Sequence, residues 1–551
     1  MGFSQRWMSE DGFHYLRIAE QIQHGHGPVF NADQRVESAT SPTWVWILAL
    51  LGWLLPFVPL ERVAVTAGLV ASGLGLWWAQ RGAVGLWERG EPANALWLPL
   101  GAWTIAALPV AWDWSTSGME TSLCMAWIGA VTLRLARISA RKRFASIADG
   151  CLLGLGPLVR PDLALLSGAA LVAVVWIHRP SLRRAWPFLA GFVALPLAYE
   201  VFRAGYYATL LPNTALAKHA SGQYWGQGWN YLIDLLLPYW LCVPLAAAAL
   251  AFGLRVRGAA RPAVVATLAL VLGGLLHALY ITRSGGCYLS GRLLIPSLFT
   301  VMAPLAAVPW RRAFVAPIAI VGLWACAAAL VLRPTIDPLQ PLAEVLSFTS
   351  RGVLDGRESM ALQVKPGRAP VLALDLDTGD GEAARRLQAE GRRALVIHEE
   401  VHLDVTPVRT TLISSSSGIS GFVAGPEVRV HQTIPLSNPV ASRMLPLRRS
   451  RPGHRKRESW PWSIAQTTRP GVTAGRDPAK IEAARRALGC GELAELLAAI
   501  SEPLDAARFW SNLRGAYRRT RLQVPRRPED AERVFCDPAG GSATSVGDAP
   551  S

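Results

Sequence analysis

The sequence predicts a polytopic α-helical membrane protein with a C-terminal α/β domain, and three observations support this fold class. Charged residues make up 17% of the 551 residues, whereas soluble globular proteins carry about 25%. Apolar residues make up 51%, and between positions 63 and 332 they form stretches long enough to cross a bilayer. After position 332 charged residues return, together with short strand and helix patterns. This composition excludes a disordered chain, collagen and a wholly soluble protein.

The membrane region is expected to contain about ten spans, some of them shorter than the usual length of ~20 residues. Two short stretches share a break at Arg160-Pro161-Asp162. The ten expected spans are 63–80, 94–112, 118–137, 147–159, 162–178, 186–203, 230–254, 262–281, 289–308 and 313–332.

The basic residues of this region predict its orientation. Alternate loops fall into two classes, one with fifteen basic residues and the other with five. Cationic loops stay in the cytoplasm, so the class with five faces outward, as do 1–62 and everything after 332. The net charge of +16 therefore mainly records topology, and nucleic acid is not expected as a partner. The five outward cations are Arg160, Arg203, Lys218, Arg283 and Arg292.

Four segments follow from these patterns. They are an outward-facing acidic loop with juxtamembrane helices at 1–62, a membrane core at 63–332, an extracytoplasmic α/β domain at 333–536 and a disordered tail at 537–551. The apolar run 43–60 can be interpreted either as a further span or as a helix along the membrane surface at 43–58.

The outer domain is expected to mix strands and helices. Asp477 is expected to cap a helix with Pro478 in its first turn. The basic loop 448–457 is either solvated or in contact with lipid phosphates or an acidic polymer. The expected elements are strands at 371–379 and 394–400 with a helix at 380–392 between them, a strand pair at 421–434, and helices at 477–499 and 503–523.

Cys490 and Cys536 are the only cysteines of the C-terminal region. If that region is extracytoplasmic, oxidising conditions favour a disulfide between them.

The outward loops carry the candidate chemistry. Glu10 and Asp11 stand at the head of a helix-like stretch, where the pair is a helix cap, a metal ligand or a general base. Arg160 lies between two short helices, and it either pairs with Asp162 or binds a phosphate. Cations beside an acidic loop suit a lipid phosphate next to a catalytic carboxylate. Further polar residues of these loops are Arg17, Asp113, Glu120, Asn213, Lys218, His219 and Arg292.

The order of these motifs resembles that of a known family. Glu10-Asp11, GHGPVFN (25–31), RVESATSP (35–42), TSGMET, RPD, PNTALAK and GRLLIP (291–296) resemble the polyprenyl-phosphate-dependent glycosyltransferases of the GT-C fold. GISGFVAG (418–425), GHRK (453–456) and WPWSIA (460–465) are similar to the outer domain of the actinobacterial terminal β-(1→2)-arabinofuranosyltransferases of cell-wall arabinan.

The resemblance implies a plasma-membrane enzyme whose active site faces the cell wall. Its donor would be decaprenyl-phosphoryl-arabinofuranose and its acceptor an arabinan end, without a nucleotide sugar. Asp11 is the expected base, with Glu10 as the second choice. No cofactor is required by the sequence, and the use of a divalent cation is left open. The expected donor-phosphate ligands are Arg17, Arg160, Lys218, His219 and Arg292, and the expected substrate-binding residues are Asn31, Glu37, Glu120 and Asn213.

Three departures from the family pattern stand out. The family has a helix ahead of the acidic motif that this chain lacks, and that absence favours a surface helix at 43–58. Cys287 replaces an acidic residue that many relatives carry, and Arg455 stands where relatives tend to have Glu. These changes permit altered specificity or an inactive member.

Overall fold

The structure is a computed structural model of the chain. It describes residues 2–89, 91–218, 222–332, 352–364, 368–376, 378–398, 400–415, 417–447 and 455–537. The chain forms two compact units, each assembled from three separate segments. The first unit comprises Met1–Leu16, Ser41–Tyr199 and Ser221–Asp377, and the second comprises Arg17–Thr40, Glu200–Ala220 and Thr378–Ser551.

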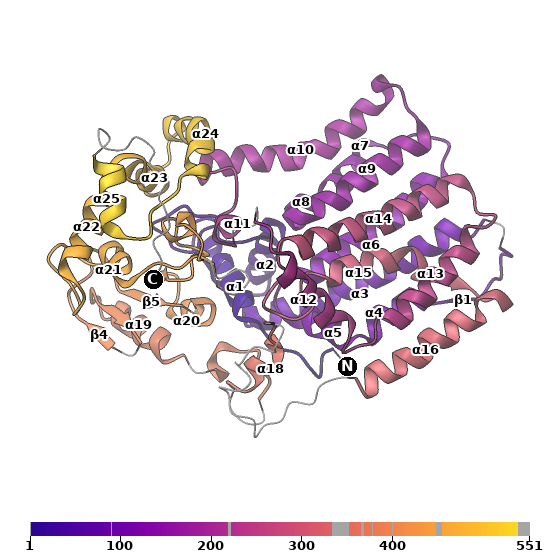
Figure 1. The fold of residues 1–551 in the computed structure, drawn as a ribbon, viewed down its shortest axis with the longest axis horizontal. Helices are drawn as coiled ribbons and strands as arrows, with labels where there is room; N and C mark the ends of the chain where they lie inside the picture. Colours follow the sequence, from indigo (N-terminus) through magenta and orange to yellow (C-terminus); the bar gives the residue numbers. More distant parts are fainter. Residues whose placement is uncertain are drawn as a thin grey trace. The chain divides into compact units, whose positions relative to one another are not determined.

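Long apolar helices dominate the first unit (Figure 1). Within the described residues, six helices of the chain are long and apolar enough to cross a membrane, which supports a membrane protein. Helices α3 and α6 pack with their backbones in contact, because a Cβ on Gly129 would lie 2.2 Å from the Gly75 carbonyl oxygen. The six are α3 (Leu60–Trp87), α6 (Thr121–Ala140), η1 with α9 (Pro161–His178), α10 (Leu182–Tyr206), α14 (Arg261–Arg283) and η3 with α16 (Arg312–Leu330).

Three expected spans are not single helices. Stretch 94–112 becomes α4 (Leu100–Ala107) and α5 (Pro109–Thr116), because Leu108 is extended before a proline that lacks an N–H. Stretch 230–254 is divided between α12 (Trp225–Leu236) and α13 (Cys242–Val256), with Pro238 in the interruption. Stretch 289–308 contains only α15 (Ile295–Met302) and η2 (Ala303–Leu305).

The predicted break at Arg160 is confirmed. Helices α7 (Ile147–Gly154) and α8 (Gly156–Val159) precede it, and Arg160 itself is extended with φ −166° and ψ 131°. The predicted strand at 371–379 is wrong, because Ala373–Asp375 forms the 3-10 helix η4. The Ala373 N–H donates to Glu61 of α3 at 3.2 Å, so a tertiary contact outweighs the strand pattern.

The apolar run after Ser41 forms the short helix α2 (Pro42–Leu54). Ser41 caps it by accepting a hydrogen bond from the Trp44 N–H. Thirteen residues extend for about 20 Å, which is less than a bilayer core of about 30 Å. The length of α2 therefore favours the surface-helix interpretation over a further span.

The second unit contains a four-stranded sheet in the order β4-β3-β5-β6 (Figure 1). Strand β3 pairs in parallel with β5, β5 pairs in parallel with β6, and β4 closes the other edge antiparallel to β3. The strands are β3 (Leu395–Ile397), β4 (Glu400–His402), β5 (Thr411–Ser414) and β6 (Arg429–Gln432). The helices are α11 (Asn213–Lys218), α19 (Gly379–Ala389), α20 (Ser417–Ala424), α21 (Trp460–Thr467), α22 (Pro478–Leu488), α23 (Gly491–Ser501), α24 (Ala506–Arg521) and α25 (Pro528–Cys536), with the 3-10 helix η5 (Ala441–Arg443).

Two outer-domain predictions need correction. The strand pair at 421–434 is half wrong, because 417–424 forms α20, and Gly425 with φ +81° ends that helix before β6. The helix at 477–499 is divided at Gly489–Cys490, although Asp477 caps its start as predicted. The strand at 394–400 and the helices at 380–392 and 503–523 are found close to their predicted bounds.

Cys490 and Cys536 form the predicted disulfide, with their Cα atoms 5.1 Å apart. It joins the start of α23 to the end of α25 beside the hydrophobic core that includes Trp462 and Leu493. Residues 538–551 of the predicted tail 537–551 lie outside the described residues, as does the first part of the basic loop, 448–454. Four short elements complete the first unit: α1 (Glu10–Gln23), which continues into the second unit, the strand pair β1 (Trp97–Leu98) and β2 (Val308–Pro309), and α18 (Gly356–Ala361).

Candidate active site

Ser9 caps helix α1, directly before the two acidic residues Glu10 and Asp11. The Gly12 N–H donates to the Ser9 Oγ at 2.9 Å, and the Ser9 Oγ donates to the Ser117 carbonyl at 3.0 Å. A Cβ on Gly12 would lie 2.6 Å from that same carbonyl, so a glycine lets the helix approach the loop before α6. Of Ser9, Glu10 and Asp11, which all favour an N-cap, Ser9 takes that position, and the two acidic residues lie in the first turn of α1.

The Asp11 carboxylate is held by Arg292, from the loop after α14. Arg292 Nη1 donates to Asp11 Oδ2 at 2.6 Å. The Arg292 side chain is 4% exposed and the Asp11 side chain 20%, so the pair is shielded but Asp11 is still reachable. The Arg292 guanidinium also lies over the Trp114 ring, 5.8 Å from its centroid.

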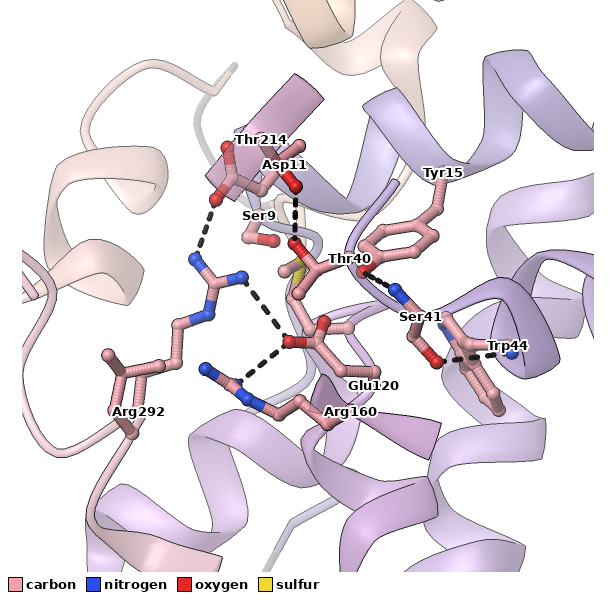
Figure 2. Close-up of polar contacts among 12 residues, drawn as sticks. Ser9, Asp11, Tyr15, Thr40, Ser41, Trp44, Glu120, Arg160, Thr214 and Arg292 are labelled. Carbon is pink, nitrogen blue, oxygen red and sulfur yellow. Dashed lines mark hydrogen bonds and ion pairs between the residues drawn. The ribbon is translucent and has the colours of Figure 1, made fainter. Parts of the chain in front are cut away.

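Glu120 lies between two guanidinium groups (Figure 2). Arg160 Nη1 donates to Glu120 Oε1 at 2.9 Å, and Arg292 Nη2 lies 3.6 Å from the same oxygen. Glu120 is fully buried at the start of α6. Burial alone would lower the pKa of Arg292, but the Glu120 and Asp11 carboxylates outweigh it and hold that pKa well above its ordinary value.

Arg160 also pairs with Asp162, as the first of its two interpretations predicted. Arg160 Nε donates to the two Asp162 oxygens at 2.8 and 3.1 Å. Because Asp162 takes Nε and Glu120 takes Nη1, the guanidinium is held from two sides. The ion pair with Asp162 is thus formed.

The sequence did not single out His277, yet this residue extends the network. His277 is 1% exposed on α14, its Nε2 lies 2.9 Å from Asp162 Oδ2, and its Nδ1 lies 2.6 Å from Ser297 Oγ on α15. The only signal in the sequence is one histidine inside an otherwise apolar span, which is costly unless it has partners. A continuous chain of contacts therefore runs from Ser297 to Asp11.

Three carboxylates and two guanidiniums make up this network, which we call the Asp11 cluster: Asp11, Glu120, Asp162, Arg160 and Arg292. A carboxylate of this kind can accept a proton from a hydroxyl group. The two arginines can stabilise the negative charge that develops on a leaving phosphate. The cluster thus combines the groups required for transfer from a phosphate-linked donor.

An apolar groove of about 350 Å³ opens in the same unit. It is bounded by α2 on one side and by α8 on the other, and the Thr43 hydroxyl donates to the Leu158 carbonyl at 2.9 Å. Leu158, which lines the groove, stands two positions before Arg160 in the sequence. The lining residues are Pro42, Thr43, Trp46, Ile47, Leu50, Leu158 and Tyr199.

Arg17 does not belong to the proposed phosphate site. It is fully buried in the second unit and donates to the backbone carbonyls of Phe30, Gly421, Gly425 and Val428. Burial lowers its pKa to about 10. Since these carbonyls occupy its donors, Arg17 ties the segment after α1 to the region around α20.

Three predicted substrate-binding residues also hold the second unit together. Asn31 donates to the Val430 carbonyl at 3.0 Å and accepts from the Val430 N–H at 2.9 Å, as a neighbouring strand would. Glu37 pairs with Arg203 at 2.6 Å. Asn213 donates to the carbonyls of Pro435 and Leu436. These contacts explain why polar residues occur at these positions without requiring that they touch a substrate.

The remaining predicted residues are placed as follows. Glu10 begins α1 next to Asp11, and Lys218 ends α11. His219 lies outside the described residues. Cys287 is half-buried as a free thiol, and Arg455 is buried in the second unit. No group of three or more His, Cys, Asp or Glu residues suited to a metal ion occurs within the described parts of the chain.

Comparison with known proteins identifies the family. The chain is 31% identical to the terminal β-(1→2)-arabinofuranosyltransferase of Mycobacterium tuberculosis, over 97% of this chain and 94% of that protein. It belongs to this family of arabinofuranosyltransferases. The chain is accordingly a glycosyltransferase.

Two further matches agree with this family. The arabinofuranosyltransferase of the same name from Corynebacterium glutamicum is 28% identical, over 97% of this chain and 85% of that protein. Residues 384–533 match the AftB family C-terminal domain, a range that includes all four strands of the sheet and all of α21–α24. No solved structure matches the chain.

Proposed function

We propose that the protein transfers arabinofuranose from decaprenyl-phosphoryl-arabinofuranose to the non-reducing end of cell-wall arabinan. The observation that carries this proposal is the Asp11 cluster, in which a reachable carboxylate contacts one of two buried guanidiniums. The names of the related proteins support arabinofuranose as the sugar and a β-(1→2) linkage as the product.

The cluster suggests how the reaction proceeds. The acceptor hydroxyl oxygen forms a bond to the anomeric carbon while the bond from that carbon to the phosphate oxygen breaks. The hydroxyl proton passes to Asp11, and the electron pair of the broken bond leaves with decaprenyl phosphate. Arg292 and Arg160 stabilise the phosphate as its charge grows.

Arg292 has a second role in this scheme. Arg292 Nη1 donates to Asp11 Oδ2 at 2.6 Å. A donor phosphate would compete with Asp11 for this guanidinium. Binding of the donor would therefore leave the Asp11 carboxylate available to the acceptor hydroxyl.

The apolar groove supports a lipid-linked donor. It is lined by Trp46, Ile47 and Leu50 from α2 and by Leu158, which stands two positions before Arg160 in the sequence. A polyprenyl chain in this groove would bring its phosphate to the guanidinium of Arg160. The loops on one side of the expected spans carry few cations, as loops that face away from the cytoplasm do. This pattern supports a site that faces the cell wall.

The proposal is tested with the full-length chain in nanodiscs, radiolabelled decaprenyl-phosphoryl-arabinose and a synthetic arabinan acceptor. Asp11→Asn keeps the shape of the side chain but removes the base, so we expect product formation to fall by at least ~100-fold. Asp33→Asn is the matched control, since Asp33 pairs at 3.6 Å with Arg429 in the second unit. Normal transfer by Asp11→Asn would exclude Asp11 as the base. Transfer from another lipid-linked pentose, with none from the arabinose donor, would overturn the proposed substrate.

A further inference from the structure

Helix α24 presents an exposed stripe of alternating aromatic and basic side chains. Trp510, Arg514, Tyr517 and Arg521 follow one another at spacings of four, three and four residues, which places them on one face of the helix. Trp510 is 56% exposed and Tyr517 60%, and both arginines are exposed. Exposing large aromatic rings to water on an open helix face costs free energy. An exposed face of this kind often marks a binding surface.

The opposite face of α24 fixes the helix to the end of α10. Asn512 is fully buried and donates to the Gly205 carbonyl at 3.0 Å. The ring of Phe509 packs so closely on Gly205 that a Cβ there would lie 2.2 Å from the ring. One turn further on, the Thr520 hydroxyl accepts from the Leu210 N–H at 2.8 Å. The stripe is therefore held rigidly beside the C-terminal end of α10.

The end of α10 gives α24 a defined depth. Helix α10 is one of the candidate spans and has 25 residues, so it is about 37 Å long, whereas a bilayer core is about 30 Å thick. Its last turns carry the ion pair of Glu200 and Arg203, which belongs in the polar headgroup layer. A helix docked at Gly205 and Leu210 consequently lies at or just beyond that layer.

The charge of this region is strongly one-sided. Residues 506–528 contain seven arginines and no acidic residue. Arg508 and Arg518 are neutralised by Glu502 and Glu495. Within the described residues, Arg514 and Arg521 have no carboxylate partner, and both belong to the stripe. The net charge of the stripe is therefore positive.

We infer that the stripe of α24 binds anionic lipid headgroups on the side of the membrane where α10 ends. Trp and Tyr concentrate at this depth because each has an apolar ring and a polar group. Arg514 and Arg521 supply the positive charge that attracts lipid phosphates. A neutral glycan would also stack on the aromatic rings, but it would not account for the positive charge of Arg514 and Arg521 on the same face. The lipid surface is thus the occupant that fits both kinds of side chain.

The test uses the full-length chain in nanodiscs that contain a phospholipid with a nitroxide on its headgroup. A fluorescent amino acid replaces Trp510 in one sample and Val408 in another, since Val408 is 71% exposed in the same unit but away from α24. We expect strong quenching at position 510, little at position 408, and an increase at 510 when anionic lipid replaces zwitterionic lipid. Equal quenching at both positions, or quenching at 510 without dependence on anionic lipid, would overturn the inference.

The charge requirement is tested by Arg514→Gln with Arg521→Gln. Each basic residue near an anionic membrane strengthens attraction by about fivefold, so the double variant should need several-fold more anionic lipid for half-maximal quenching. Arg385→Gln with Arg386→Gln is the matched control, because both arginines are exposed on α19 in the second unit. If soluble arabinan fragments, but not lipids, change the fluorescence at position 510, the face binds glycan and the inference fails.

Discussion

The Arg292 guanidinium donates to the Asp11 carboxylate at 2.6 Å, although the two residues are separated by 281 positions. The same guanidinium lies 3.6 Å from Glu120. One arginine thus joins the head of α1 to the start of α6, and two sites that are remote in the sequence become one charged centre.

Replacing Arg292 by Lys should impair transfer while keeping the charge. An ammonium is a single point of contact and cannot bridge Asp11 and Glu120 as the planar guanidinium does. The loss of one hydrogen bond between charged groups costs about 1.5–3 kcal/mol, so kcat/KM should fall by roughly 10-fold to 100-fold. Steady-state kinetics on Arg283→Lys, a cation at the end of α14, gives the matched control. Equal kinetics of the two variants would show that the bridge is dispensable.

His277 should act as a positioning residue through Asp162. His277→Leu removes the contact at 2.9 Å and leaves a buried carboxylate with Arg160 as its remaining partner, at a cost of about 1–3 kcal/mol. Arg160 would then be less well oriented, so KM for the lipid donor should rise more than KM for the acceptor. His277→Gln restores a donor and should recover part of the affinity. If both variants lose thermal stability without a change in donor KM, the residue has only a structural role.

The sequence predicted the chemistry of the site better than its geometry. Asp11, Glu120, Arg160 and Arg292 were grouped only because all four lie in loops expected on the same side of the membrane. Polar residues in a membrane protein are costly and gather where they function. Arg17 shared that sidedness and is nevertheless buried against backbone carbonyls. Composition does not distinguish an arginine that binds a phosphate from one that holds a loop through hydrogen bonds. Both need partners that carry negative charge or partial negative charge.

The fold shows the same limit. Spans with uninterrupted apolar sequence, such as 262–281, are found as single helices, because nothing competes with the helical backbone there. Stretch 94–112 is also mostly apolar but is divided at Leu108, where the following proline disfavours a helical conformation. Stretch 371–379 alternates like a strand, yet its Ala373 N–H donates to Glu61 of α3. Glu61 lies about 300 positions earlier, so no local sequence pattern predicts this contact.

Filling the apolar groove should affect long-chain donors selectively. Ile47→Trp adds volume against Leu158, so we expect KM for the decaprenyl donor to rise by at least ~10-fold, a cost of about 1.4 kcal/mol. A donor with a short prenyl chain does not reach far along the groove and should be much less affected. Trp53→Ala is the control, because Trp53 is 70% exposed on α2 and does not line the groove. Equal effects on both donors would place the lipid chain elsewhere.

Removing the disulfide should destabilise the helical part of the second unit. Cys490 and Cys536 are 46 positions apart, and closing a loop of that length restricts the unfolded chain by about 4 kcal/mol in the entropic model. Cys490→Ser with Cys536→Ser should therefore make α22–α25 more sensitive to limited proteolysis. Cys151→Ser is the control, since Cys151 is a free thiol in α7. Resistance unchanged by either the double variant or a reductant would contradict the prediction.

Lys456 should make the stability of the second unit depend on pH. Its ammonium is buried and donates to the Ser442 carbonyl at 2.7 Å, and burial, with a smaller effect of Arg443, lowers its pKa to about 8. Between this pKa and the ordinary value of 10.5, the unfolded chain binds a proton that the folded chain has released. Stability therefore rises with pH across this window, and below it the buried charge is a constant cost. Lys456→Met removes the charge, so its Tm should exceed that of the wild type most at pH 7 and the gap should narrow by pH 9.5. A gap that stays constant over this range would show that Lys456 does not titrate there.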